Sequence, residues 1–169
     1  MDEIGRFVET FRARATSTAR SKLDALLDLE RFDDPRVLQF LLDVLADKAE
    51  LALVRIHVLK RLRNGNIPPI NRPAIAEVML RVLSDDSGPD LRMQAALALA
   101  EFADIHGVPA RLGSLALDPD ETIDLRFSAF TSLQRAGPST ECVAVLRQLL
   151  ADESLGPSAR RVLSPWRLA

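Results

Sequence analysis

The chain has 169 residues, a hydrophobic content of 47% and a formal net charge of −2. This length suits one domain, and the hydrophobic content is sufficient for a continuous buried core. Because Cys142 is the single cysteine, the sequence excludes an intramolecular disulfide and metal sites built on paired cysteines, and it favours a reducing, cytoplasmic compartment.

Charged residues also argue against a membrane segment. Residues 1–20 carry seven charged side chains, and no later stretch approaches the roughly 18 uncharged residues of a membrane span. Basic residues outnumber acidic ones by 14 to 12 up to residue 84 and are outnumbered by 12 to 8 after it, which leaves head-to-tail self-association open. Of the 22 basic residues, 19 are arginine, a composition typical of a GC-rich bacterial genome.

Proline and glycine divide the chain into segments of roughly 10 to 16 residues, the length of helices. Within each segment apolar residues recur at three and four positions, as they do over residues 37–45, which predicts one buried stripe along a helix. No strand-like alternation occurs, so the expected class is all-α. The ten predicted helices cover residues 3–14, 17–31, 35–46, 50–64, 73–84, 89–104, 108–117, 122–136, 140–151 and 157–164.

A pattern of an apolar residue, an arginine, and apolar residues four and eight positions after the first recurs along the chain, in truncated form at its end. Successive arginines are 35, 37, 34 and 34 residues apart, a period that indicates two-helix repeats. An aspartate lies seven or eight positions before each of the last four arginines. The arginines are Arg20, Arg55, Arg92, Arg126 and Arg160, and the aspartates are Asp47, Asp85, Asp118 and Asp152.

This recurrence resembles the HEAT-repeat superfamily over nearly the whole chain. The resemblance implies a single domain folded as a right-handed α-solenoid of about five antiparallel helix pairs, with units of approximately 1–33, 34–70, 71–105, 106–137 and 138–169. It also implies that the aspartates and arginines form a structural ladder that fixes the stacking of neighbouring repeats. Tetratricopeptide repeats have a similar period, but their Trp, Gly-Tyr and Ala-Phe signature is missing from every unit.

The sequence predicts no catalytic residue, no cofactor and no metal site. His57 and His106 belong to different repeats, outside any spacing that places two metal ligands on one helical face. No glycine-rich phosphate loop and no GxSxG occurs. Cys142 lies in an apolar helical run, which predicts a buried, inert thiol rather than a nucleophile.

Surface residues of the second helices are therefore the candidate site. If these helices line a concave face, as the family resemblance implies, their polar side chains form a groove that binds a peptide or helix; the alternative is an ordinary solvated face. The residues are His57, Lys60, Arg61, Asn64, Gln94, Glu101, Ser128, Ser132 and Arg135. The only tryptophan, Trp166, follows Pro165 and is expected to fold over the open end of the core, with an exposed contact as the alternative.

The expected function is a non-catalytic protein–protein interaction module or scaffold that binds another protein or peptide. One alternative is an enzyme or enzyme subunit that resembles the HEAT-like bilin lyases, which only the repeat pattern supports. The other is a nucleic-acid-binding protein that resembles the HEAT-like alkylpurine glycosylases. The slightly acidic chain, which has no tyrosine, lacks the electrostatic footprint expected for phosphate binding.

Overall fold

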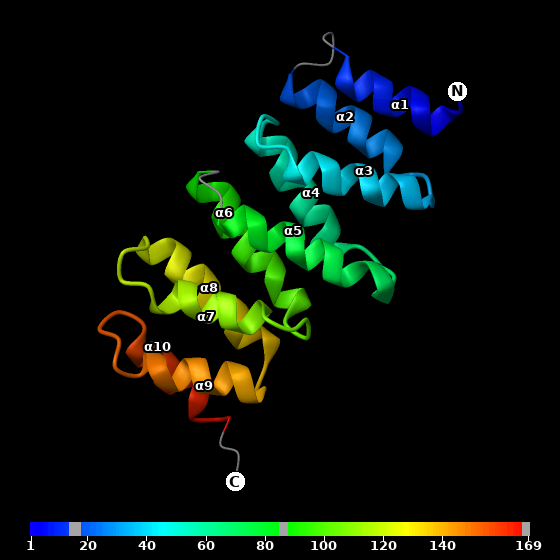
Figure 1. The fold of residues 1–169 in the computed structure, drawn as a ribbon. Helices are drawn as coiled ribbons and strands as arrows, with labels where there is room; N and C mark the ends of the chain where they lie inside the picture. Colours follow the sequence, from blue (N-terminus) through cyan, green and yellow to red (C-terminus); the bar gives the residue numbers. More distant parts are fainter. Residues whose placement is uncertain (14–17, 85–87, 167–169) are drawn as a thin grey trace. The chain divides into compact units, whose positions relative to one another are not determined.

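The computed structural model describes residues 1–13, 18–84 and 88–166, and these residues form ten α-helices, two short 3₁₀ helices and no strand (Figure 1). The predicted all-α class is confirmed, and the predicted boundaries at residues 14 and 17 lie outside the described residues. The α-helices are α1 (Glu3–Arg12), α2 (Ala19–Leu29), α3 (Pro35–Ala46), α4 (Ala52–Asn64), α5 (Arg72–Ser84), α6 (Pro89–Ala98), α7 (Val108–Leu117), α8 (Ile123–Ala136), α9 (Thr140–Leu149) and α10 (Gly156–Leu163).

Local sequence signals explain where the helices begin. Five of them follow a Ser, Thr or Asp whose side chain accepts a backbone N–H of the first turn, which satisfies a group that the helix itself leaves unpaired. Asp34 is one of them, and its hydrogen bonds from the Arg36 side chain and backbone lower its pKa to about 2. The caps are Asp2, Thr18, Asp34, Thr122 and Ser139.

The largest difference from the predicted helix lengths is at α6. Residues 89–104 were expected to be continuous, but α6 ends at Ala98 and the chain continues as the 3₁₀ helix η2 (Leu99–Phe102). The other 3₁₀ helix, η1 (Pro69–Asn71), directly precedes α5. None of the described helices is both long and apolar enough to cross a membrane.

The chain divides into two compact units, Met1–Arg61 and Leu62–Ala169, and the division falls inside α4. The first unit contains α1, α2, α3 and most of α4. Its core includes an edge-to-face contact between Phe11 of α1 and Phe40 of α3, with ring centroids 5.2 Å apart. α1 and α2 also pack against each other.

In the second unit consecutive helices pack as the pairs α5/α6, α7/α8 and α9/α10. Neighbouring pairs are joined in two layers: α7 contacts both α5 and α9, while α6 contacts α8 (Figure 1). The buried residues between the layers are almost all aliphatic or alanine, with Phe102 and Phe130 as the aromatic members. This arrangement leaves one face of the even-numbered helices turned away from the odd-numbered layer.

Candidate partner-binding surface

Arg126 shows how the repeated arginines are used. It lies on α8 and is only 7% exposed. Its Nε donates to the carbonyl oxygen of Ala116 near the end of α7 at 3.0 Å, and its terminal nitrogen pairs with Asp152 in the turn between α9 and α10. The side chain therefore binds a carbonyl that helix geometry leaves unpaired and, at the same time, ties α8 to the next helix pair.

The same carbonyl contact recurs at two other arginines. Arg55 Nε donates to Leu45 O at the end of α3, and Arg92 Nε donates to Leu83 O at the end of α5, both at 2.9 Å. In each case the acceptor is the penultimate residue of the preceding helix, where the helix dipole favours a cation.

The acidic partner of Arg92 is not the expected aspartate. Arg92 binds the carboxylate of Glu121, with Nη1 3.2 Å from Oε2, rather than that of Asp118. Asp118 instead accepts the backbone N–H of Asp120 at 2.9 Å, and Asp47 accepts that of Ala49 at the same distance. These aspartates shape the turns, because a carboxylate two residues before an N–H closes a local hydrogen-bonded ring. Asp85 lies outside the described residues.

The first repeat has a different register from the one expected. Arg20 is exposed, and the cation of α2 that reaches the next turn is Lys22, whose Nζ lies 2.6 Å from Glu50. Leu27, the apolar residue eight positions after Ala19 in the repeated pattern, is 52% exposed, whereas Leu26 and Leu29 are fully buried. Lys22 therefore forms the ion pair with the next turn that was expected of Arg20. The spacing of acidic residues in the sequence indicates its partner. Glu50 follows Asp47 by three residues, as Glu121 follows Asp118.

Arg160, the last arginine of the series, is exposed on α10. We use the word rung for an ion pair between a cation of an even-numbered helix and a carboxylate in the turn between the two helices of the next pair. The described rungs are Lys22–Glu50, Arg92–Glu121 and Arg126–Asp152.

In the first unit, two of the three predicted site residues share one carboxylate. His57 Nε2 lies 2.9 Å from Glu30 Oε1, and Arg61 Nε lies 3.3 Å from Glu30 Oε2, so both side chains of α4 are joined to the end of α2. Lys60 is exposed next to them. Sequence analysis missed Glu30, which follows the last apolar residue of α2 and carries no motif of its own.

In the second unit the predicted residues separate into different roles. Ser132 does not belong to the surface: it is fully buried, and its hydroxyl donates to the carbonyl oxygen of Ala96 at 2.6 Å, which joins α8 to α6. Glu101 and Arg135 are exposed and paired with each other at 2.7 Å. Ser128 donates to Asp124 O within its own helix at 2.8 Å. Gln94 is half-buried on α6, and Asn64 is exposed at the end of α4.

Two exposed apolar side chains of α8 were not predicted. Ile123 and Phe127 are one turn apart and are 47% and 43% exposed. Phe127 makes an edge contact with the buried Phe130, with ring centroids 5.7 Å apart. Together with Val162 of α10 and Trp166, the two phenylalanines line a groove between α8 and the end of the described chain. Trp166 is half-buried, next to the side of α8.

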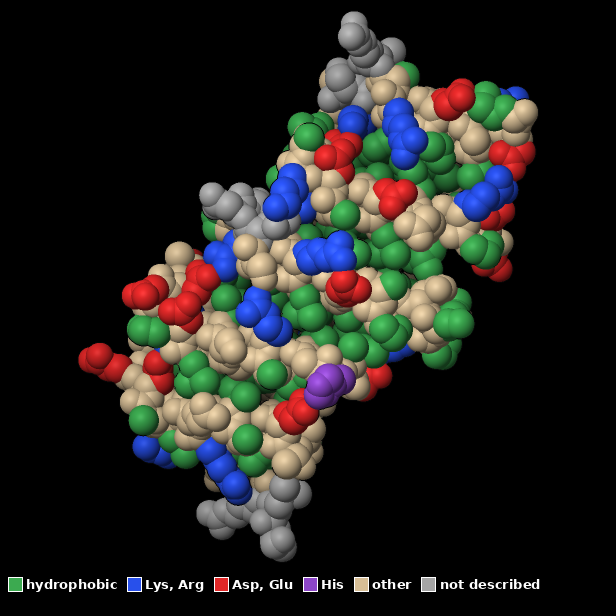
Figure 2. Space-filling view, in the orientation of Figure 1, with side chains coloured by type: hydrophobic (Ala, Val, Ile, Leu, Met, Phe, Trp, Pro, Cys, Tyr) green, Lys and Arg blue, Asp and Glu red, His purple; other side chains and the backbone are tan. Residues whose placement is uncertain are grey.

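Charges of both signs are interspersed over the visible face of each unit (Figure 2). Several basic residues are already neutralised: Arg61 by Glu30, and Arg72 by Asp104 while it lies over the ring of Phe102. Among the described residues, no group of three or more His, Cys, Asp or Glu side chains is arranged to hold a metal ion. Cys142 is buried.

No protein-family model and no curated protein sequence matches the chain.

Proposed function

We propose that the chain is a non-catalytic interaction module, built as a HEAT-like α-solenoid of about five helix pairs, that binds a protein partner through the concave surface of its second helices, and in the second unit through the face of α6 and α8 that is turned away from the odd-numbered layer. The observation that carries the proposal is the exposure of Ile123 and Phe127 on adjacent turns of α8. Single exposed apolar residues are common, but two on adjacent turns beside a groove of mixed aromatic and polar lining fit a contact surface.

The rungs support the same function. Two partly or largely buried arginines of the repeats, Arg92 and Arg126, form ion pairs that hold helix pairs together. Stacked repeats of this kind form extended surfaces that bind other chains without a catalytic constellation. The single, buried Cys142 and the absence of a membrane-spanning candidate among the described helices are consistent with a cytoplasmic module, which is part of the proposal.

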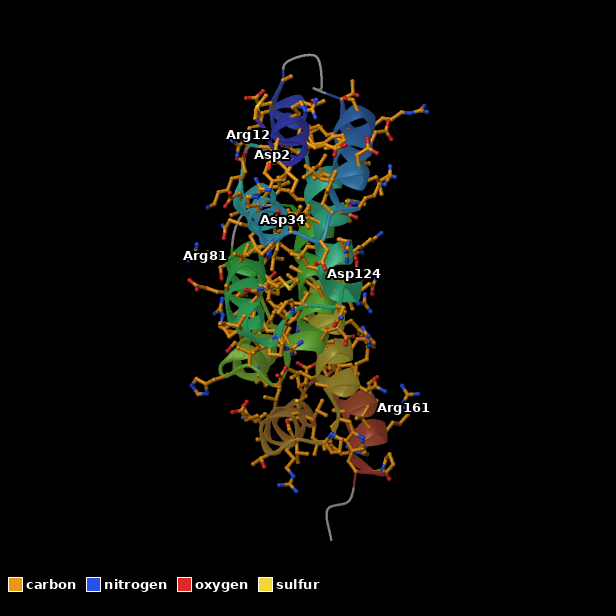
Figure 3. The ribbon with its side chains drawn as sticks, turned by 90° about the vertical axis from the view of Figure 1, so that its right-hand side faces the viewer. Asp2, Arg12, Asp34, Arg81, Asp124 and Arg161 are labelled. Carbon is orange, nitrogen blue, oxygen red and sulfur yellow. The ribbon has the colours of Figure 1, made fainter. Side chains whose placement is uncertain are left out.

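Photo-crosslinking from single positions tests this function. Benzoylphenylalanine is placed at Gln94 of α6 or Phe127 of α8, and at Arg81 of α5 as the control, and each variant is irradiated in extract of the source cells. Arg81 lies on the opposite side of the second unit from α8 and α10, as its position relative to Asp124 and Arg161 shows (Figure 3). We expect one adduct of defined mass from Gln94 and Phe127 and none from Arg81.

Adducts that form equally from all three positions would contradict the proposal, because they would indicate random collision. Adducts from Arg81 alone would place the binding surface on the odd-numbered layer.

A further inference from the structure

The repeat pattern changes beside the groove of α8. Ala96 of α6 lies four residues after its rung arginine, and the position four residues after Arg126 is Phe130. Between α6 and α8 the small side chains allow Ser132 to reach the Ala96 carbonyl. Between α8 and α10 the larger phenylalanine occupies the equivalent place.

The short last helix enlarges this opening. α10 ends at Leu163 after eight residues, whereas α8 has fourteen. Ser164 still has helical backbone geometry, but Pro165 has no backbone N–H to continue the helical hydrogen bonds, so α10 ends just before it. The second half of α8, out to Gln134, therefore borders a groove of about 530 Å³, a volume in the range of ligand-binding pockets.

The side chains along the groove define what it can bind. Phe127, Val162 and Trp166 provide apolar surface, and the guanidinium of Arg161 stands beside them. Arg161 is exposed and donates to the hydroxyl of Ser158 at 3.2 Å, which leaves further N–H donors directed at solvent. Among the described residues that line the groove there is a cation and no carboxylate.

We propose that this groove binds a short peptide segment of a partner protein in which a large apolar side chain lies close to an aspartate or glutamate. The apolar side chain packs against Phe127 and Trp166, and the carboxylate accepts hydrogen bonds from Arg161. The inference rests on the proposed function and specifies the kind of partner sequence that this part of the surface recognises.

A phage-displayed library of random dodecapeptides, selected on the full chain, provides the probe. Because Trp166 is the only tryptophan, its fluorescence reports directly on the groove when a selected, tryptophan-free synthetic peptide is titrated. We expect the selected peptides to pair an aromatic or leucine residue with Asp or Glu, and to shift the Trp166 emission. Arg161→Glu should weaken binding about tenfold or more, since a charge-assisted hydrogen bond is replaced by repulsion.

Arg160→Glu is the matched control, because it makes the same charge change on the neighbouring exposed residue, outside the groove lining. Arg160→Glu should change the peptide affinity less than about twofold, because a charge that does not contact the bound peptide contributes little to affinity. Equal losses for the two variants, selected peptides without acidic residues, unchanged Trp166 emission or the absence of any selected peptide would each overturn the inference.

The outcome for the groove is separable from that for the proposed function. If the crosslink from Gln94 persists in Arg161→Glu while no peptide binds the groove, the interaction module stands and the groove assignment is wrong. If neither Gln94 nor Phe127 forms an adduct, the proposed function itself fails.

Discussion

A single buried side chain, Arg126, connects two helices of the second unit with the turn that precedes a third. It bonds a carbonyl of α7 from its position on α8 and pairs with Asp152, which precedes α10. Asp152 in turn accepts the backbone N–H groups of Ser154 and Leu155 at 2.9 and 2.8 Å. The guanidinium and the carboxylate are thus each held by further hydrogen bonds, which is the condition under which a largely buried ion pair is tolerated.

Removing the guanidinium should be costly. Arg126→Ala removes the cation that pairs with Asp152 and the donor to the Ala116 carbonyl, and we expect the free energy of unfolding to fall by about 3 kcal/mol. Arg160→Ala, at the corresponding but exposed position of the last repeat, should cost less than about 0.5 kcal/mol. Urea unfolding followed by circular dichroism measures both, and similar losses would show that Arg126 does not form a structural rung.

Asp152 also predicts a dependence of stability on pH. The backbone N–H of Leu155, followed by the Arg126 side chain and the N–H of Ser154, lowers its pKa in the folded state. A lowered folded pKa means that the carboxylate stabilises the fold above its unfolded pKa of about 3.9, and that this contribution is lost as pH falls through the folded pKa.

Asp152→Asn retains an oxygen that can accept the two backbone N–H groups but removes the charge. The variant should therefore be less stable than the wild type at pH 7, and the gap should narrow as the pH is lowered below 4. Urea unfolding at a series of pH values from 7 to 3 measures this gap. If the stability difference between the two proteins stays constant over the series, the charge of Asp152 is not its cause.

At the scale of helices, the close approach of α7 and α9 depends on a glycine. A Cβ added to Gly113 would lie 2.7 Å from Cγ2 of Val145 on α9, too close for an unmodified packing. Glycine in a helix interior costs about 1 kcal/mol relative to alanine, so its presence here is explained by packing and not by helix propensity.

Gly113→Ala should consequently destabilise the chain by about 1 to 3 kcal/mol, although alanine is the better helix former. Val145→Ala in the same chain removes the clashing methyl groups, so the double variant should lose less than the sum of the single variants. A double-mutant cycle by thermal or urea unfolding measures the coupling, which we expect to exceed about 1 kcal/mol. Additive losses would mean that α7 and α9 move apart instead.

At the scale of the whole molecule, several ion pairs connect segments that are far apart in the sequence. In the second unit, the pairs Arg72–Asp104, Arg92–Glu121 and Arg126–Asp152 all join different segments of the chain. The groove beside α8 lies next to the last helix pair, whose arginine of the series, Arg160, is exposed. Recognition is therefore expected where the repeat is irregular, since regular positions are already engaged in stacking.

The sequence by itself determined the helices and the fold class. Apolar periodicity, proline and glycine positions and capping residues such as Asp34 and Thr122 act within a few residues of the chain, so they can be read directly from it. The tertiary structure decided the rest. Whether Lys22 or Arg20 forms the first rung, and whether Ser132 faces solvent or the Ala96 carbonyl, depends on which groups come within hydrogen-bonding reach across helix pairs. Packing between helices decides which groups come that close, so these contacts cannot be predicted from a local sequence pattern.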